Sequence, residues 1–244
     1  MQKVIEVKNL SKIFNNNTVA VNGISFDVRE NEVFGLIGPN GSGKTTIQRM
    51  LATILEPTSG IIRYYGKELS ETDANRIREV IGYVPQGACL YGDLTVAENL
   101  DIFSKPYRLE NSQRIKNISN LIKNLGLEER KNTLVKNLSG GLAKRASIAI
   151  ALVHEPKILF LDEATMGLDP NSRYEIWKLT EDLKKKTTIV FTTHYMDEAE
   201  KLCDRLAILS QGKILELDLP QKILSKYQAK NLNEVIAQII KKEK

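Results

Sequence analysis

The chain has 244 residues, of which 42% are hydrophobic and 27% are charged, and this composition excludes a disordered protein. It holds no run near the roughly 20 apolar residues that a membrane-spanning helix needs, and its first residues lack the apolar core of a signal peptide, so we expect it to stay in the cytoplasm. The net charge of +5 comes from 35 basic and 30 acidic residues that are interspersed, which indicates a solvated surface, and we expect no nucleic-acid partner.

The first part of the chain combines short strands with a glycine-rich segment. Strand patterns at residues 4–7 and 24–28, on either side of the polar turn 15–17, predict a small β layer. The apolar run 32–37 predicts a buried strand, and a helical pattern extends from residue 44 to about 55. Strand, glycine loop and helix follow one another in the order that α/β nucleotide-binding folds use.

The pattern then changes to helices and returns to strands. From residue 87 to about 138, helices with polar faces such as 113–125 predict an inserted helical subdomain. Continuous apolar runs follow at residues 157–161, 188–191 and 206–209. Because these runs alternate with helices, they predict parallel strands that are covered on both faces.

We therefore expect one α/β domain over residues 1–244. Its β layer and mostly parallel core would occupy about 1–86 and 156–220, the inserted α-helical subdomain about 87–155, and a C-terminal helical tail about 221–244. Apolar residues recur on one helical face near the end of the chain, so the tail should include a docked amphipathic helix.

A phosphate-binding loop is the clearest motif. Gly38-x-x-x-x-Gly43-Lys44-Thr45 fits the pattern G-x-x-x-x-G-K-[ST] without a mismatch and lies between a predicted strand and helix. Its glycines let successive backbone N–H groups face one centre, where the helix N-terminus adds positive potential. Lys44 should reach the β- and γ-phosphates, and the Thr45 hydroxyl should coordinate Mg²⁺. The predicted phosphate-binding residues are Gly38, Pro39, Asn40, Gly41, Ser42, Gly43, Lys44, Thr45 and Thr46.

Two further motifs distinguish among the kinases, GTPases and transport ATPases that share such a loop. The segment Ser139-Gly140-Gly141 opens a helix predicted over residues 142–154, and Ser139 would also serve there as an ordinary N-cap. The pair Asp162-Glu163 closes a predicted strand, as acidic residues at a strand end of a nucleotide-binding fold do.

Together these motifs resemble those of the ABC ATPase family, whose members carry a phosphate loop, an LSGG signature, a strand that ends in Asp-Glu and a later histidine. The resemblance covers residues 3 to 220 and implies a P-loop NTPase with a RecA-like core, with ATP and Mg²⁺ as cofactors. It implies that Asp162 supports Mg²⁺ and that His194 contacts the γ-phosphate. Glu163 would be the general base, since a carboxylate one residue beyond the metal-side aspartate can reach the γ-phosphate side. Lys44, Glu163 and His194 form the implied catalytic set.

Three other positions receive roles from the same resemblance. Gln86 would sense Mg²⁺ and the γ-phosphate, so that the implied metal set is Thr45, Gln86 and Asp162. Asp169 would lie in a loop that crosses a dimer interface, and Phe14 would stack on adenine. From the residues alone, Gln86 is a solvated turn residue and Phe14 is equally a core or edge aromatic.

The sequence departs from the family pattern at three positions. Leu142 stands where the signature often has Gln, Ala164 replaces a common Pro, and Met166 replaces a small residue. None of these changes removes a phosphate ligand, so we expect activity to survive. Leu142 and the segments 94–100 and 194–200 are similar to the drug- and lipid-export branch of the family.

The resemblance also implies partners. Two such chains, identical or related, would stack head to tail, and Ser139, Gly140 and Gly141 of one would complete the γ-phosphate site of the other. An integral membrane transporter subunit would hold the chain on the cytoplasmic face of the cell membrane, with export as the expected direction. The alternative is a soluble, non-transport ABC ATPase that acts on nucleic acid or the ribosome. Such relatives usually have a long coiled-coil insert or a second cassette, and neither is present in this sequence.

Overall fold

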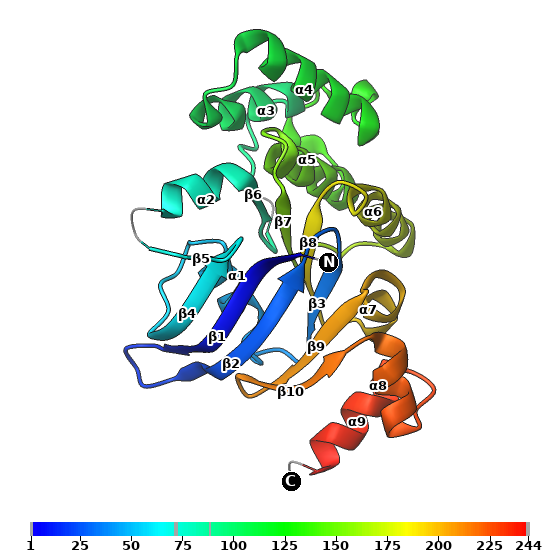
Figure 1. The fold of residues 1–244 in the computed structure, drawn as a ribbon. Coiled ribbons are helices and arrows are strands. Elements are labelled where there is room, and N and C mark those ends of the chain that lie inside the picture. The colour runs from blue at the N-terminus through cyan, green and yellow to red at the C-terminus, as the bar shows by residue number, and fades with distance from the viewer. Residues whose placement is uncertain (1, 71–72, 88, 243–244) are drawn as a thin grey trace.

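Two β-sheets organise the computed structural model, which describes residues 2–70, 73–87 and 89–242 (Figure 1). The first sheet is antiparallel, with the strand order β2-β1-β4-β5. Its strands are β1 (Lys3–Ile13), β2 (Val19–Arg29), β4 (Ser59–Tyr64) and β5 (Lys67–Glu68). The predicted N-terminal β layer is therefore present, although β1 and β2 are longer than the predicted strands because they pair along most of their length.

The second sheet has the strand order β10-β9-β3-β8-β7-β6, and its strands are parallel except for β10. They are β3 (Val33–Ile37), β6 (Ile81–Val84), β7 (Ile158–Asp162), β8 (Thr188–Thr193), β9 (Arg205–Ser210) and β10 (Lys213–Asp218). β3, β7, β8 and β9 are buried along their whole length, as parallel strands covered on both faces should be. The predicted α/β fold, with a mostly parallel sheet and an antiparallel N-terminal sheet, is confirmed.

Helices cover both faces of the second sheet and extend it at one end (Figure 1). They are α1 (Lys44–Leu51), α2 (Ala74–Val80), α3 (Val96–Ser104), α4 (Asn111–Asn124), α5 (Gly140–Leu152), α6 (Pro170–Leu183), α7 (Met196–Leu202), α8 (Pro220–Tyr227) and α9 (Leu232–Lys242). α1 packs between the two sheets, and α5 to α9 contribute to the core on the opposite face. α3 and α4 pack on α5 through a separate apolar cluster around Leu100 and Ala146.

Several helix limits differ from the prediction by a few residues, and two of these differences have a local cause. α1 ends at Leu51 and not near residue 55, because Thr53 adopts a left-handed backbone with φ 59° that a helix cannot continue. α5 begins at Gly140, two residues before the predicted start, because Ser139 is its N-cap and the helix starts at the next residue. The proposed subdomain limits near residues 87, 155 and 220 stay a prediction.

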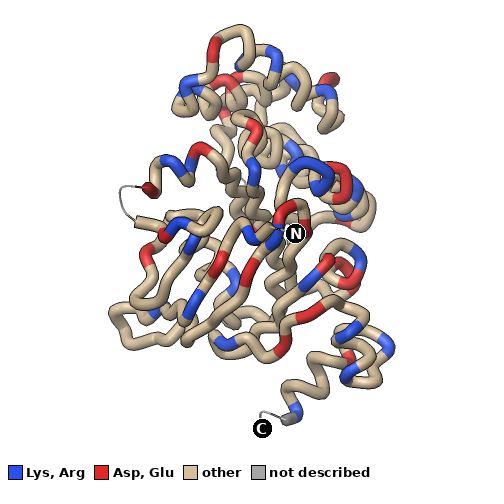
Figure 2. Tube along the Cα trace, in the orientation of Figure 1, with Lys and Arg blue, Asp and Glu red and all other residues tan. Residues whose placement is uncertain are grey.

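The distribution of charged residues and the length of the apolar helices are relevant to the kinds of partner that the chain could bind. Figure 2 shows basic and acidic residues interspersed along all parts of the trace. Among the described residues, none of the helices combines the length and the apolar character that crossing a bilayer requires.

Candidate functional site

The predicted phosphate loop, residues 38–43, connects the carboxyl end of β3 to α1. Gly38 and Gly43 have φ values of 152° and 102°, which favour glycine. A Cβ atom at Gly38 would lie 2.3 Å from the carbonyl oxygen of Leu209, and one at Gly43 would lie 2.5 Å from that of Ala20. Only glycine fits at both positions, so the loop can curl tightly in front of the N-terminus of α1.

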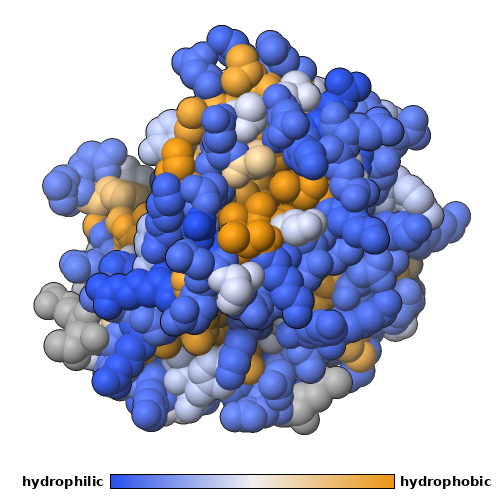
Figure 3. All heavy atoms as spheres, turned by 90° about the horizontal axis from the view of Figure 1, so that it is seen from above, coloured by the Kyte–Doolittle hydropathy of each residue, from blue (hydrophilic) through white to orange (hydrophobic). Residues whose placement is uncertain are grey.

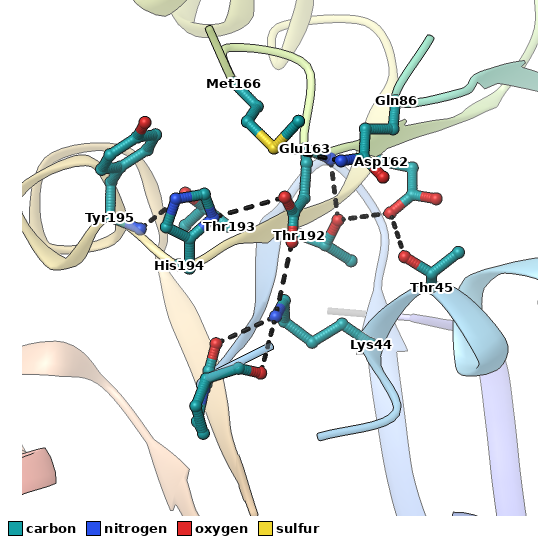
Figure 4. Close-up of polar contacts among 12 residues, drawn as sticks. Lys44, Thr45, Gln86, Asp162, Glu163, Met166, Thr192, Thr193, His194 and Tyr195 are labelled. Carbon is teal, nitrogen blue, oxygen red and sulfur yellow. Dashed lines mark hydrogen bonds and ion pairs between the residues drawn. The ribbon is translucent and has the colours of Figure 1, made fainter. Parts of the chain in front are cut away.

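Lys44, the first residue of α1, folds back over this loop (Figure 4). Its Nζ atom donates hydrogen bonds to the carbonyl oxygens of Gly38 at 2.9 Å and Pro39 at 3.1 Å. The same atom lies 3.4 Å from Oε1 of Glu163. Burial lowers the pKa of the Lys44 amino group, and the Glu163 carboxylate acts in the opposite sense. A buried cation is thus held at the centre of the loop.

Asp162, the last residue of β7, is held by three hydroxyl groups. Its Oδ1 atom accepts hydrogen bonds from Oγ1 of Thr45 and Oγ1 of Thr192, both at 2.9 Å. Its Oδ2 atom accepts one from the hydroxyl of Tyr83 at 3.0 Å. Burial and the nearby Asp162 carboxylate raise the pKa of the Tyr83 hydroxyl, so it remains a donor. The carboxylate is therefore oriented from α1, β6 and β8 together.

Glu163 points away from its neighbour Asp162. It follows β7 directly and has a φ of 45°, a left-handed conformation that is uncommon for a residue with a side chain. Its backbone N–H donates to Oγ1 of Thr192 at 2.9 Å, which fixes this turn. As a result, the Glu163 side chain faces Lys44 on one side, and its Oε2 atom lies 3.3 Å from Nδ1 of His194 on the other (Figure 4).

The position of His194 is set by its neighbours in the turn after β8. The hydroxyl of Thr193 donates to the buried carboxylate of Glu198 at 2.6 Å and accepts from the backbone N–H of Tyr195 at 3.0 Å. Glu198 also accepts a hydrogen bond from the indole N–H of Trp177 at 2.6 Å. The turn is thereby anchored to α6 and α7, and the imidazole of His194 is directed toward Glu163.

A cavity of about 390 Å³ lies over the loop. Its lining residues are Thr18, Val19, Ala20, Asn40, Gly41, Gly43, Lys44, Thr45, Thr46, Gln86, Glu163 and Met166. Nε2 of Gln86 donates to the sulfur of Met166 at 3.0 Å, so the Gln86 amide faces a thioether in this structure.

The residues at this cavity fit a magnesium nucleotide. The hydroxyl of Thr45 and the carboxylate of Asp162 are the hard oxygen donors that Mg²⁺ prefers. The described residues hold no group of three or more His, Cys, Asp or Glu side chains that could bind a metal by themselves. Mg²⁺ binds through one or two carboxylates together with phosphate oxygens, and Asp162 would supply one such carboxylate. Ser42 Oγ is buried without a hydrogen-bond partner in the described structure, so the loop has a polar atom available to a phosphate.

Other predicted residues form a second group, which we term the signature surface: Ser139, Gly140, Gly141 and Asp169. Ser139, Gly140 and Asp169 are exposed, whereas Gly141 is buried. Ser139 caps α5, and Asp169 caps α6 by accepting from the backbone N–H groups of Asn171 and Ser172. A Cβ atom at Gly141 would lie 2.4 Å from Oγ of Ser172, so the two helix starts pack tightly together. Within the described chain, none of these four residues lines the cavity over the phosphate loop.

Phe14 also lies apart from that cavity wall. It stands in the turn between β1 and β2, is 39% exposed, and has the Lys12 ammonium 5.6 Å from its ring centroid. Thr18 of the same turn and Val19, the first residue of β2, line the cavity. The adenine-stacking role of Phe14 stays a prediction.

Two site residues were not predicted. Thr192 and Tyr83 both donate to Asp162, and Thr192 also accepts from the Glu163 backbone. Thr192 has a signal in the sequence, because it follows the predicted buried strand 188–191 and the carboxyl ends of parallel strands meet at one edge of a sheet. Tyr83 lies in β6, which is not among the strands predicted from the sequence.

Comparison with known proteins agrees with this geometry. A family model described as ABC transporter matches residues 21–166. The chain is 39% identical over 223 residues to the Nod factor export ATP-binding protein I of Ralstonia nicotianae, and the match covers 91% of this chain and 69% of that protein.

Solved structures give the same result. The fold is similar to that of CbiO1 from Clostridium perfringens, part of the ABC transporter complex CbiONQ, with a TM-score of 0.85 and 31% identity over 93% of this chain and 92% of that one. It is also similar to the ATP-binding cassette MJ0796 in a dimeric, post-hydrolysis state bound to ADP and Pi, with a TM-score of 0.78 and 27% identity over 88% of this chain and 98% of that one. The chain belongs to the ABC transporter family, as an ATP-binding ATPase with the P-loop fold.

Proposed function

We propose that the chain hydrolyses ATP at the interface of a head-to-tail dimer and so powers a membrane-bound exporter. The observation that carries this proposal is the separation of the site into two parts. Lys44 and Glu163 line the phosphate-loop cavity, and Asp162 accepts a hydrogen bond from Thr45 in the same cavity wall, whereas the signature surface lies elsewhere on the same chain.

The phosphate-loop part would bind the nucleotide. Lys44 would hold the β- and γ-phosphates, while Thr45 and Asp162, together with Gln86, would hold Mg²⁺. Bound Mg²⁺ would supply charge that neutralises the phosphate oxygens. Thr192 and Tyr83 orient the Asp162 carboxylate for this task by donating to both of its oxygens.

Glu163 would accept a proton from the attacking water. Its carboxylate lies between the loop cation Lys44 and the imidazole of His194, and it lines the cavity in which the γ-phosphate would lie. His194 would contact the γ-phosphate and keep the water in place. The left-handed backbone of Glu163 supports the assignment, since such strain is common at catalytic residues.

The signature surface would complete the site of a second subunit. Ser139 and the N-terminus of α5 offer a hydroxyl and free N–H groups to an anion, and both Ser139 and Asp169 are exposed. Head-to-tail stacking of two chains would bring this surface over the partner's phosphate loop. The similar cassette MJ0796 is dimeric.

A separate apolar cavity supports the proposal that the chain binds a membrane protein. It has a volume of about 540 Å³ and lies near Gln86, with Tyr83, Leu90, Phe103 and Tyr107 among its lining residues. Tyr83 both lines it and donates to Asp162, so an occupant would contact a residue of the phosphate site. Figure 3 shows apolar side chains gathered in a hollow on the face seen from above, where a partner could cover them.

Such a partner would keep the chain at the cytoplasmic face of a membrane. The direction of transport rests on the similarity to a Nod factor export ATP-binding protein. Capture experiments test the proposal. A tagged Glu163→Gln chain should recover an integral membrane protein from solubilised membranes of its own organism, in amounts comparable to the bait. A Lys44→Ala bait serves as the control for nucleotide dependence. Recovery of ribosomes or nucleic acid without a membrane protein would instead support a soluble ABC ATPase.

A further inference from the structure

Lys144 is a buried cation outside the predicted site. It lies on α5, five positions after the N-cap Ser139, and is 5% exposed. Its Nζ atom donates hydrogen bonds to the carbonyl oxygens of Pro85 at 3.0 Å and Gln86 at 2.8 Å. The helix that begins at the signature surface is thus bonded to the backbone segment that carries Gln86.

These two carbonyl groups are the contacts that stabilise the cation. In the part of the chain that the structure describes, no carboxylate forms an ion pair with Lys144. Burial lowers the pKa of its amino group, and the more distant Asp162 carboxylate acts in the opposite sense. Hydrogen bonds from a charged donor are stronger than neutral ones, and a buried charge that loses its partners is costly. The segment therefore resists separation from α5.

The contact restrains the backbone of Gln86 and leaves its side chain to move. Nε2 of Gln86 faces Met166 at the phosphate-loop cavity, and the neighbouring Pro85 lines the apolar cavity. Lys144 therefore lies where three regions meet: the signature helix, the Gln86 side chain at the phosphate site, and the wall of the apolar cavity.

We propose that Lys144 is a positioning residue that makes the start of α5 and the backbone at residues 85–86 move as one body. A shift of the signature surface would then displace Gln86, and an occupant of the apolar cavity that moves Pro85 would displace the signature surface. This inference rests on the proposed function, because Gln86 and Ser139 act together only if ATP binds between two chains.

Hydrogen–deuterium exchange of the full chain without nucleotide tests the tether itself. Lys144→Met removes the charge and all donors while keeping an unbranched side chain, and Lys144→Arg keeps a cation with donors. Lys116→Met, on the exposed face of α4, is the matched control. Amides within residues 83–92 should exchange roughly tenfold faster in Lys144→Met only, with the peptide over residues 38–47 unchanged. Unchanged exchange in residues 83–92 would overturn the proposal.

The coupling is tested with ATP-dependent dimers in the Glu163→Gln background. Adding Lys144→Met should raise the ATP concentration at half-maximal dimer formation by about tenfold, while monomer affinity for a fluorescent ATP analogue changes less than about twofold. Lys144→Arg should restore most of the response. An unchanged midpoint, or an equal loss of monomer affinity, would reject the coupling role. If the Glu163→Gln parent formed no dimer, the proposed function would fail in its dimer step, and the exchange experiment would still decide the tether.

Discussion

The carboxylate of Glu163 lies 3.4 Å from the ammonium group of Lys44, and both side chains are almost fully buried. The cation of the phosphate loop and the proposed general base therefore pair with each other in this structure. Phosphate oxygens bound at the loop would compete for Lys44 and leave Glu163 available to accept a proton from water. The pairing therefore leads to different expectations for a substitution of Glu163 and for a substitution of Lys44.

Glu163→Gln should preserve ATP binding and slow hydrolysis. The amide cannot accept the proton of the attacking water, so phosphate release should fall by roughly 10²- to 10⁴-fold. Affinity for ATP should stay equal or rise, because a carboxylate that competes for Lys44 has been removed. Phosphate-release kinetics and calorimetric titration measure the two effects. Glu181→Gln, on the exposed side of α6, is the control, and undiminished phosphate release by Glu163→Gln would contradict the base assignment.

Lys44→Ala should weaken ATP binding and also destabilise the fold. Removing the cation leaves the buried Glu163 carboxylate without its partner, at an expected loss of roughly 1–3 kcal/mol in the free energy of unfolding. The double variant Lys44→Ala with Glu163→Gln should recover most of that loss, since no unpaired charge remains. Urea unfolding of the four proteins gives the coupling energy. A double variant whose losses simply add would show that the two groups do not interact.

The phosphate loop, the signature and the buried strands could be predicted from the sequence, because each is a local pattern. The contacts around Asp162 could not. They depend on the parallel register of β6, β7 and β8, in which Asp162 pairs with Thr192 and Tyr83 pairs with Phe160. Periodicity identifies a strand but not its neighbours in the sheet, so the roles of Thr192 and Tyr83 required the structure.

Three other features could not be predicted from the local pattern. The helical pattern predicts α5, but no local signal indicates that Lys144 bonds to carbonyl groups more than fifty positions earlier in the chain. α1 ends earlier than the helical pattern predicts, because the pattern continues past Thr53, whose left-handed backbone stops the helix. The contact between Gln86 and Met166 likewise joins two distant loops.

His154 should make stability depend on pH. It follows the C-terminal end of α5, its Nε2 atom lies 2.9 Å from the carbonyl oxygen of Ile81, and its ring stacks on Tyr107 with centroids 3.7 Å apart. Burial lowers its pKa from the ordinary value of 6.5. Below that pH the unfolded chain binds a proton that the folded chain does not, so this contribution to stability is full above pH 6.5 and is lost as the pH falls toward the folded pKa.

His154→Phe keeps a stacking ring but removes the titration. Between about pH 7.5 and 5.5, the melting temperature of the unchanged chain should fall further than that of the variant. The variant should be less stable at the higher pH, because the Ile81 carbonyl loses its donor. Thermal unfolding followed by circular dichroism measures both effects. If the melting temperatures of the two proteins fell by the same amount across this pH range, His154 would not contribute to the pH dependence of stability.

Mixing two inactive variants tests whether the site is shared between chains. Lys44→Ala damages the phosphate-loop part, and Ser139→Arg damages the signature surface, which lines no part of the phosphate-loop cavity within the described chain. Each variant alone should be inactive. Random mixing makes half of the dimers mixed, and each mixed dimer has one intact site of two, so the mixture should recover about a quarter of the wild-type rate.

The control is a second mixture, in which chains that carry only Lys44→Ala are mixed with chains that carry only Glu163→Gln. Both changes lie in the phosphate-loop part, where the two side chains pair, so every site in a mixed dimer carries one of the two lesions and no activity should return. Recovery in the first mixture and not in the second requires that the phosphate loop of one chain works with the signature surface of another. Equal behaviour of the two mixtures would mean that each chain completes its own site. In that case Ser139 would have to reach the phosphate loop of its own chain through a movement of α5, and the restraint that Lys144 places on that helix would oppose such a movement.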